Sequence, residues 1–365
     1  MAHRPIRVLY VNGGLMDRGG VSSVMMSYYL KFDPEKIHVD FIVHGKAEGE
    51  RDKEILSRGS HIFNVTPKSH NPVRNYFELK KIMTEGNYDI VHAHADSGNA
   101  LILKIAKLCN IKVRISHSHN TNYTISNKFR IFLNNIQKNQ ITRYATAQWA
   151  CSRLAGEWLY GIESKFEVIP NAIDTSRFAY NVNIRESIRS EYGLENKIII
   201  GHIGRFDFQK NQEFLLDSFY KAEKKNADLM LVFIGDGKDR SLIESKIGQL
   251  GLQDKVVIMG QRRDVDSLIN VFDVFAFPSR FEGLGIVVVE AQTNGLHCIV
   301  SDQVPSEANL TGNVEFLPLN SSTWVEELLK PYYRDADARE KVINCGYDIN
   351  SAANLVQNKY IEMVN

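Results

Sequence analysis

Arg205 and Lys210 carry the charges in the second half of the chain that would suit binding of a diphosphate. They stand five residues apart, between an apolar run that predicts a strand and a pattern that predicts a helix. A planar guanidinium and the point charge of an ammonium are complementary ligands for two linked phosphates. The alternative is that both cations are ordinary solvated surface charges.

Two carboxylates follow the apolar run that ends at Phe277. Two glycines flank Leu284 where a helix should begin, and this helix is almost wholly apolar yet carries Glu290. A buried carboxylate is costly unless it is paired or bound to ligand hydroxyls. Glu282, in the loop before the helix, could reach the same ligand. The alternative is a structural glutamate that caps backbone N–H groups.

A glycine-rich loop, residues 12–20, follows the first predicted strand and precedes a helix that begins near Val21. Glycines let the backbone approach a ligand closely, and a helix N-terminus offers unpaired N–H groups to an anion. The spacing is not GxGxxG, and no acidic residue follows the second strand to hold a ribose, which disfavours a nicotinamide site. The alternative is a tight turn without a ligand.

Histidines end two of the predicted strands in the first half of the chain. His117 and His119, followed by Asn120, could ligate a metal, but no third ligand with suitable spacing is evident and there is no DxD motif. The favoured function is that one of them orients a sugar or supports charge at a reaction centre. We interpret His92 and His94, after another strand, as structural.

A long basic stretch lies between Asp96 and Glu157, with no acidic residue between them. Within it, 128–143 interleaves cations with apolar residues, as an interfacial helix would. Contact with anionic lipid or a lipid-linked diphosphate is the functional interpretation; ordinary solvated helix faces are the alternative, and no nucleic-acid motif accompanies the charge. The basic residues are Lys104, Lys107, Lys112, Arg114, Lys128, Arg130, Lys138, Arg143 and Arg153.

The whole chain has the composition of an ordinary globular protein. Its 365 residues predict two domains, since a domain usually has about 100–200 residues. A net charge of +1 argues against nucleic-acid binding by the chain as a whole. Four cysteines without a CxxC pair argue against a zinc site or a disulfide framework and fit a reducing, cytoplasmic compartment. No apolar run is long enough for a membrane span, and we expect no secretion signal.

Predicted strands and helices alternate along both halves, which predicts two doubly wound parallel sheets. Because ligands of such sheets bind beyond the carboxyl ends of the strands, two facing sheets would place a ligand between domains. We expect the domains to join after 169–171, in the polar stretch 174–191. The predicted strands are 7–11, 39–43, 62–65, 90–93, 113–116, 197–203, 229–234, 256–259, 274–277 and 298–301. The predicted helices are 21–30, 52–58, 76–85, 100–108, 211–226, 238–250, 265–270, 286–294 and 352–364.

Taken in order, four motifs resemble those of the GT-B retaining glycosyltransferases of family 4. They are the double glycine 19–20, the sequence VIPNAID at 168–174 with Phe178, the pair Arg205 and Lys210, and Glu282 with Glu290 around a Gly-Leu-Gly turn. The match covers nearly the whole chain. It departs from the family pattern at Ala172, where a glycine is usual, and at 295–298, where a proline is customary.

The resemblance implies an α/β fold of the GT-B type, with two facing Rossmann-like domains and a cleft between them. The expected domains are 1–173, which binds the acceptor, and 174–349, which binds the nucleotide-sugar, with a C-terminal helix at about 350–365 packing back on the first. The implied donor-binding residues are Gly19, Gly20, Arg205, Lys210, Arg262, Glu282, Gly283, Leu284, Gly285 and Glu290. The implied catalytic residues are Arg205, Lys210, His117 and Glu282, with His119 and Asn120 on the acceptor side.

The implied reaction is transfer of a hexose from a nucleoside diphosphate sugar to a hydroxyl of a glycan or lipid-linked glycan, with retention at the anomeric carbon. Family frequency favours UDP as the nucleotide, and the resemblance implies neither a metal nor a cofactor. Exopolysaccharide or other cell-surface glycan synthesis is the expected setting, in the cytoplasm or at the inner face of the cell membrane, where the chain would contact anionic lipid. The alternatives are a non-catalytic nucleotide-sugar-binding partner subunit and a GT-B nucleotide-sugar epimerase.

Overall fold

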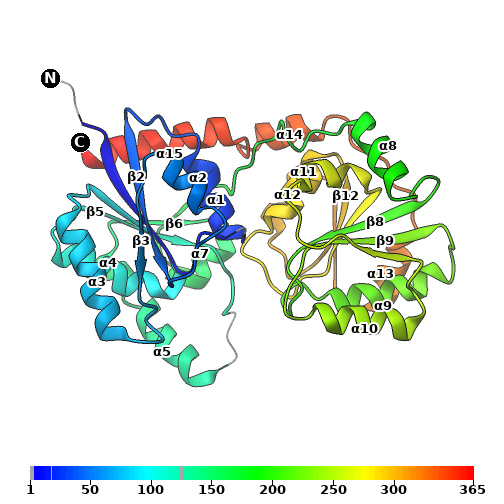
Figure 1. Cartoon of the computed structure of the whole chain (residues 1–365), viewed down its shortest axis with the longest axis horizontal. Helices are drawn as coiled ribbons and strands as arrows, with labels where there is room; N and C mark the ends of the chain where they lie inside the picture. The colour runs from blue at the N-terminus through cyan, green and yellow to red at the C-terminus, as the bar shows by residue number, and fades with distance from the viewer. Residues whose placement is uncertain (1–3, 18, 124–126) are drawn as a thin grey trace. The chain divides into compact units, whose positions relative to one another are not determined.

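The computed structural model describes residues 4–17, 19–123 and 127–365, and the chain divides into two compact units. Unit 1 comprises Met1–Ala172 and Ile349–Asn365, and unit 2 comprises Ile173–Asp348. The C-terminal segment therefore returns to the unit in which the chain begins. Figure 1 shows the two units, each with its own sheet.

Unit 1 is built on a seven-stranded sheet whose strand order is β3-β2-β1-β4-β5-β6-β7, with every neighbouring pair parallel. Its central strands β1 and β4 are largely buried on both faces, as parallel strands covered by helices must be, and β4 is buried although it contains His92 and His94. The strands are β1 (Ile6–Asn12), β2 (Ile37–His44), β3 (Ile62–Val65), β4 (Ile90–His94), β5 (Val113–Ser118), β6 (Ala147–Ala150) and β7 (Glu167–Val168).

Helices cover the sheet of unit 1, and the last of them comes from the end of the chain. α15 lies against α1, and the Tyr360 hydroxyl is 3.0 Å from that of Tyr10 on β1 (Figure 1). The backbone N–H of Asp33 donates to the Gln357 side chain. The helices are α1 (Gly20–Tyr29), α2 (Asp52–Ser57), α3 (Pro72–Glu85), α4 (Asn99–Leu108), α5 (Lys128–Lys138), α6 (Ile141–Tyr144), α7 (Arg153–Tyr160) and α15 (Ile349–Val364), with a 3-10 turn at Asp96–Gly98.

Unit 2 has a six-stranded parallel sheet with the order β10-β9-β8-β11-β12-β13. Phe206, Phe219, Phe233 and Trp324 are buried in its main core cluster. The strands are β8 (Ile198–Ile203), β9 (Leu229–Ile234), β10 (Val256–Ile258), β11 (Val274–Phe277), β12 (His297–Ser301) and β13 (Val314–Leu317). The helices are α8 (Val182–Glu191), α9 (Gln212–Glu223), α10 (Arg240–Leu250), α11 (Val265–Leu268), α12 (Ile286–Thr293), α13 (Ser321–Leu328) and α14 (Ala338–Asn344), with 3-10 turns at Ile269–Val271 and Ser306–Ala308.

Strand order reverses direction at one point in each sheet. In unit 1 the chain leaves β1 on one side and returns at β4, and in unit 2 it leaves β8 and returns at β11. Ligands of open parallel sheets bind at the carboxyl ends of the strands beside such a point. The loops after β1, β4, β8 and β11 are therefore the places where the fold positions functional groups.

The elements differ from the sequence prediction at several points. β6, β7 and β13 were not predicted, and neither were α7, α13 and α14. The polar stretch 174–191 was expected to join the domains, yet it contains α8, whose Arg185 and Arg189 both pair with Asp273 of unit 2. The expected interfacial helix 128–143 is two helices, α5 and α6. Among the described residues, no helix is long and apolar enough to cross a bilayer.

Candidate functional site

The loop after β8 is held in place by close backbone packing. Gly235 has φ +142°, and a Cβ there would lie 2.1 Å from the carbonyl oxygen of Gly204. A Cβ on Gly237 would lie 2.3 Å from the carbonyl oxygen of Phe206, whose ring is fully buried. Only glycine permits both approaches. The loop that carries Arg205 and Lys210 is therefore anchored on both sides of Arg205.

Lys210 and Glu282 form a largely buried ion pair that joins the loops after β8 and β11. Lys210 Nζ lies 2.7 Å from Glu282 Oε1, and the side chains are 18% and 8% exposed. The ammonium also lies 4.6 Å from the centre of the Phe277 ring, as in a cation–π contact. Each charge would be costly to bury alone, so the pairing offsets the cost of burial and holds both side chains in position.

A set of neutral contacts supports this pair. Asn211 has φ +58°, which asparagine tolerates better than most residues, and its amide donates to the Pro278 carbonyl oxygen at 3.1 Å. Arg280 donates to the Asn211 side chain at 2.7 Å. Gln212 donates to the Arg205 carbonyl oxygen at 2.9 Å. The sequence analysis did not single out Asn211, Gln212 or Arg280. The two consecutive amide residues Asn211 and Gln212, at the start of a predicted helix, were the signal that could have indicated a role for that pair.

Arg205 differs from Lys210 in its surroundings. Its side chain is exposed, and within the described ranges no carboxylate pairs with its guanidinium. Its carbonyl is held by Gln212, so the backbone is fixed while the charged end is accessible. This arrangement leaves all five N–H donors of Arg205 available to an anion.

The turn 283–285 leads into α12, which carries Glu290 in its second turn. Gly285, at φ +85°, precedes α12, and Leu284 is 1% exposed. Burial raises the pKa of Glu290 to about 8, and the positive charge of Arg177 opposes that rise only in part. Arg177 itself pairs with Asp266. Glu290 is therefore mostly protonated at neutral pH in this structure.

Arg262, in the loop after β10, is engaged locally. Its guanidinium binds both oxygens of Asp264, at 2.9 and 2.7 Å, and this pairing raises its pKa. The side chain is thus oriented along its own loop, and the expected contact of this residue with a base is through the backbone.

In unit 1 the loop after β1 presents Gly19 and Gly20 at the start of α1. The Gly19 N–H donates to the Asp17 carboxylate at 2.8 Å, and Ser22 donates to the same oxygen at 3.2 Å. A Cβ built on Gly20 would meet no atom of the described residues within 4 Å. The backbone at this helix start therefore lies open to an incoming group. Arg18, which the sequence places in this loop, lies outside the described residues.

Four histidines from β4 and the end of β5 form one buried array. His92 Nε2 lies 3.1 Å from His117 Nδ1, and His94 Nδ1 lies 2.8 Å from His119 Nε2, so each pair shares a hydrogen bond. The two pairs stack, with ring centres 4.1 Å apart for His92 and His94 and 4.3 Å for the other two. Burial lowers all four pKa values, that of His119 to about 3. The array is therefore neutral at physiological pH.

The array is tied to other elements at both ends. The Tyr360 hydroxyl of α15 lies 2.7 Å from His92 Nδ1. At the carboxyl end of the sheet, Asp96 accepts hydrogen bonds from the His119 backbone N–H at 3.0 Å and the Asn120 amide at 2.6 Å. Asp96 has φ +47°, and burial raises its pKa. Asp96 thus fixes His119 and Asn120 at the edge where ligands of such sheets bind, whereas the ring of His117 lies farther inside.

The histidine array differs from two interpretations of the sequence: that no third imidazole stands near, and that His92 and His94 are only structural. His92, His94 and His117 each place a possible ligand atom within 4.8 Å of the others, so a third imidazole does stand near, contrary to the expectation from spacing. The parallel register of β4 and β5 supplies it, which spacing along the chain cannot show. His92 and His94, interpreted as structural, are the direct hydrogen-bond partners of the two candidate histidines. Asp96 was not singled out; its position after a strand was the available signal.

Comparison with known proteins identifies the family of the chain. The family model described as "Glycosyl transferases group 1" matches residues 184–347, and the model described as "Glycosyltransferase Family 4" matches residues 18–177. EpsF of Bacillus subtilis, which carries the name of a glycosyltransferase, is 32% identical over 97% of this chain and 96% of its own. A galactosyltransferase of Escherichia coli, named for UDP-Gal and a GlcNAc-diphosphoundecaprenol acceptor, is 24% identical over 80% of each chain.

Solved structures share the fold at low sequence identity. HepE of Anabaena, in complex with UDP and glucose, superposes with a TM-score of 0.80 at 15% identity, covering 98% of this chain and 100% of that one. Sucrose-phosphate synthase of Thermosynechococcus elongatus gives a TM-score of 0.75 at 16% identity, covering 99% of each chain. With two Rossmann-like sheets and both family models matched in order, the chain belongs to the family 4 glycosyltransferases of GT-B fold.

Proposed function

We propose that this glycosyltransferase binds a nucleoside diphosphate hexose at the carboxyl ends of β8 and β11 in unit 2. The observation that carries the proposal is the Lys210–Glu282 ion pair beside the exposed guanidinium of Arg205. Two cations at one strand edge match the charge of a diphosphate, and a carboxylate beside them matches sugar hydroxyls. Gly283, Leu284 and Gly285 form the turn before α12, whose first N–H groups would face the phosphates.

The chemistry follows from where charge develops. As the bond between sugar and diphosphate breaks, the leaving oxygen gains negative charge and the sugar becomes oxocarbenium-like. Arg205 and Lys210 would stabilise that leaving charge, which lowers the barrier more than it strengthens binding of the intact donor. In the retaining mechanism of this family, the leaving phosphate removes the proton of the incoming hydroxyl on the same face. Glu282 then acts as a sugar binder and not as a nucleophile.

The remaining donor residues are proposed in narrower roles. Glu290 would bind the ribose hydroxyls, and the backbone of Arg262 would contact the base. Gly19 and Gly20 in unit 1 would let the backbone approach the diphosphate. The reaction is proposed to need neither a metal nor a cofactor, because two cations and helix N–H groups supply the positive charge.

The histidine array is proposed to serve the acceptor side of the reaction in unit 1. His117 or His119 would hold a sugar oxygen by a neutral hydrogen bond, and Asn120 would bind the acceptor. His119 is the first to test, because Asp96 holds its backbone at the carboxyl end of the sheet. A neutral imidazole can donate a hydrogen bond without placing a positive charge beside the departing diphosphate.

UDP is the proposed nucleotide, and a glycan on a lipid carrier is the proposed acceptor. Support comes from HepE, solved with UDP and glucose, and from the E. coli relative, whose name specifies UDP-Gal and a diphosphoundecaprenol-linked acceptor. A relative named for capsular polysaccharide synthesis in Staphylococcus aureus, 28% identical over 78% of each chain, fits the same setting. The enzyme would then work in the cytoplasm, at the inner face of the cell membrane.

Calorimetric titration tests the donor site directly. The purified protein is titrated with UDP, GDP, ADP and CDP in EDTA, and the best ligand is then titrated into Lys210→Met with Glu282→Gln, a double variant that leaves no unpaired charge. Binding of one nucleotide that is lost in the variant is the expected result. Binding of none, or binding only after a divalent metal is added, would contradict the proposed site.

A further inference from the structure

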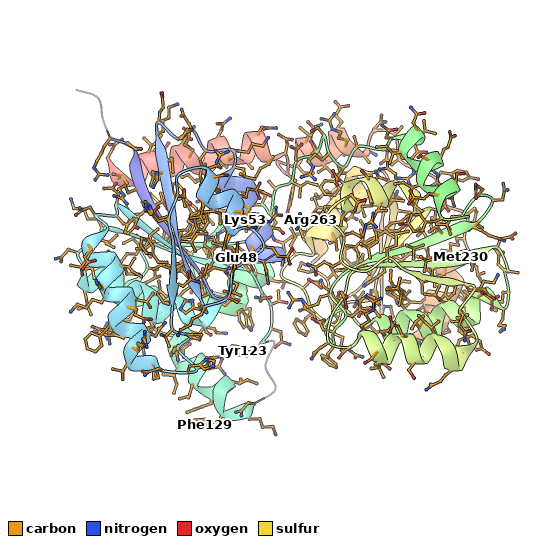
Figure 2. The ribbon with its side chains drawn as sticks, viewed as in Figure 1. Glu48, Lys53, Tyr123, Phe129, Met230 and Arg263 are labelled. Atoms are coloured by element: carbon orange, nitrogen blue, oxygen red, sulfur yellow. The ribbon has the colours of Figure 1, made fainter. Side chains whose placement is uncertain are left out.

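An apolar stripe on α5 faces away from the core of unit 1. Phe129, Phe132, Leu133 and Ile136 follow the spacing i, i+3, i+4, i+7, so their side chains lie on one face of the helix. They are 68%, 59%, 39% and 44% exposed. Such a stripe normally packs against a core, and large exposed apolar patches mark interaction surfaces. Phe129 is labelled on α5 in Figure 2.

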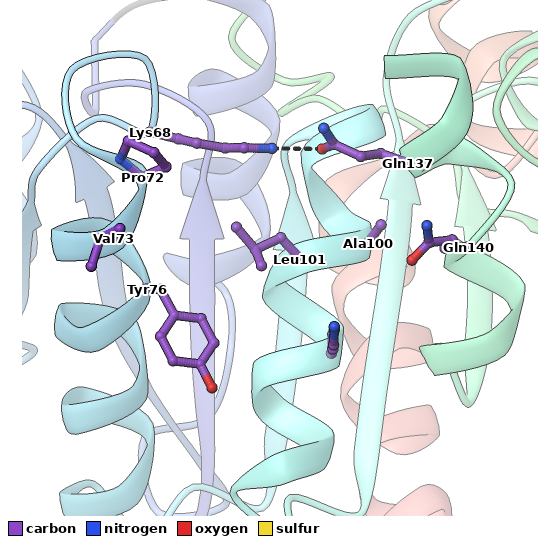
Figure 3. A pocket seen from close by; sticks show the side chains of 9 residues that line it. Lys68, Pro72, Val73, Tyr76, Ala100, Leu101, Gln137 and Gln140 are labelled. Atoms are coloured by element: carbon purple, nitrogen blue, oxygen red, sulfur yellow. Dashed lines mark hydrogen bonds between the residues drawn. The ribbon is translucent and has the colours of Figure 1, made fainter. Parts of the chain in front are cut away.

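A groove of about 450 Å³ lies beside this stripe, between α3, α4 and the end of α5. Its walls include Val73 and Tyr76 of α3 and Leu101 of α4, and its charged residues are Lys68 and Lys104. Figure 3 shows Tyr76 and Leu101 in this groove. Among the residues that the structure describes, no carboxylate lines it. The groove therefore combines an apolar interior with two cations.

The Lys68 side chain spans the mouth of the groove. It donates to the Gln137 side chain of α5 at 2.7 Å, as the dashed line in Figure 3 marks. A neutral amide holds the ammonium without neutralising it, so its charge remains available to an anion. The contact also ties the loop before α3 to the helix that carries the stripe.

The chain segment that carries the stripe has one sign of charge. No acidic residue occurs between Asp96 and Glu157, a segment that includes α4, α5 and α6. Two of its cations are half-buried: Arg114 donates to backbone carbonyls, and Lys138 contacts Trp158. The exposed ones are Lys104, Lys107, Lys112, Lys128, Arg143 and Arg153, of which Arg153 pairs with Glu157; the side chain of Arg130 is not described.

We propose that the α5 stripe and the adjoining groove form a docking surface for an anionic lipid bilayer, with the groove receiving one lipid between Lys68 and Lys104. The proposal rests on the proposed lipid-carried acceptor, since docking would bring the enzyme to that substrate. Amphipathic helices bind such surfaces by burying aromatic and aliphatic side chains at the headgroup level while nearby cations attract the lipid phosphates. The stripe supplies the apolar side chains that would be buried, and the exposed lysines supply the cations.

Charge complementarity favours an anionic bilayer over a second copy of the chain as the partner of this surface. A symmetric dimer through α5 would bring the same basic surface of two chains together, which like charges oppose. A neutral glycan could pack against the two phenylalanines but would leave the lysines without a counter-charge. An anionic bilayer satisfies both features of the surface.

Vesicle flotation with the full chain tests the proposal. The vesicles are phosphatidylcholine alone, or equal parts of phosphatidylcholine and phosphatidylglycerol. We expect flotation with the anionic vesicles only, weakened by added salt because exposed charges are screened. The double variant Phe129→Ser, Phe132→Ser should lose affinity for these vesicles by more than about tenfold. Lys104→Gln with Lys107→Gln should lose it by about tenfold and become less sensitive to salt.

A matched control and a second measurement separate the outcomes. Leu242→Ser, on α10 of unit 2, removes an apolar side chain that is 49% exposed and should float like the wild type. Failure of the wild type to float, or equal flotation of the phenylalanine variant, would overturn the proposal. So would sedimentation of the wild type as a dimer and of the variant as a monomer without vesicles. UDP titration of the same variants should be unchanged, so failed docking with intact UDP binding refutes docking and not the donor site.

Discussion

The two units place their candidate groups at the same point of the same kind of sheet, yet they bury polarity in opposite ways. In unit 2, Lys210 and Glu282 are both charged and lie 2.7 Å apart. In unit 1, four imidazoles are packed together, and burial lowers the pKa of each so that they stay neutral. Pairing of opposite charges and loss of charge are the two physical routes to burying a titratable group.

The ion pair of unit 2 and the neutral histidines of unit 1 suit different steps of the reaction. A charged site can oppose the negative charge that develops on a departing diphosphate, because its field is already in place. A neutral imidazole array can hold and orient hydroxyls without adding to that field. We therefore infer that unit 2 governs the energy of bond breaking and unit 1 the position of the acceptor, and the following predictions test this division.

The largest expected effect is loss of the Lys210 charge. Lys210→Met with Glu282→Gln should lower turnover by about 10²–10³-fold, because one preorganised charge at the leaving group is removed. Lys210→Met alone should also destabilise the fold by about 3–5 kcal/mol, since the buried carboxylate of Glu282 loses the ammonium that balances its charge. Turnover and urea unfolding of both variants measure the two effects separately. A single variant as stable as the wild type would refute the mutual dependence of the pair.

Arg205 should affect the reaction without affecting the fold. Arg205→Ala should lower turnover by about 10²-fold, because its guanidinium is exposed and aimed at no protein carboxylate among the described residues. Surface substitutions of this kind usually change stability by less than about 0.5 kcal/mol. Arg58→Ala is the matched control, because it removes an exposed arginine at the end of α2 in unit 1, and its turnover should match that of the wild type. Near-normal turnover in both the Arg205 and Lys210 variants would refute the donor-site assignment.

The sequence identified the charges of unit 2 because they lie within single loops. Arg205 with Lys210, and Glu282 with Glu290, are close in sequence, and parallel strands bring the two loops to one edge. The contact of Glu282 with Lys210 follows from that topology, although the sequence analysis predicted only that Glu282 could reach the same ligand as Glu290. By contrast, the pairing of His92 with His117 depends on the register of β4 and β5, and Tyr360 reaches His92 from the far end of the chain. Neither contact leaves a signal in local spacing.

The elements of the fold were likewise predicted where the local sequence carries a signal and missed where it does not. Continuous apolar runs such as 198–203 predict buried parallel strands well, and the two doubly wound sheets are confirmed. β7 has two exposed residues at the edge of its sheet, so it carries no apolar signal. α8 has no buried residue and is held by ion pairs of Arg185 and Arg189 with Asp273, which explains why 182–191 resembled a linker.

Acid should destabilise unit 1 through its neutral histidine array. The histidines hold lowered pKa values when folded but return to about 6.5 when unfolded, so the unfolded chain binds more protons below that pH. Stability is therefore complete above about pH 6.5 and falls as the pH drops toward about 3. Each such imidazole costs up to about 1.4 kcal/mol per pH unit in this window.

Thermal unfolding at about pH 7.5 and about pH 5 measures this dependence. His94→Gln should lower the difference in melting temperature between the two conditions, because one titrating ring is removed. His202, in unit 2, is also buried, with its pKa lowered to about 4, so His202→Gln is the control for the contribution of the other unit. Equal melting temperatures of the wild type at both pH values would contradict the neutral array.

Glu290 is an exception to the contrast between the two units, because it lies in unit 2 but is kept neutral by burial. Burial raises its pKa to about 8, so the folded chain holds this proton while the unfolded chain loses it near pH 4.5, and stability falls as the pH rises between these values. An ionised carboxylate accepts ribose hydroxyls more strongly than a protonated one. UDP affinity of the wild type should therefore rise a few-fold from about pH 6.5 to about pH 8.5, whereas Glu290→Gln should show no such rise. Calorimetric titration with UDP at both pH values measures this difference. If the affinities of the wild type and of Glu290→Gln change equally with pH, Glu290 does not bind the ribose and has only a structural role.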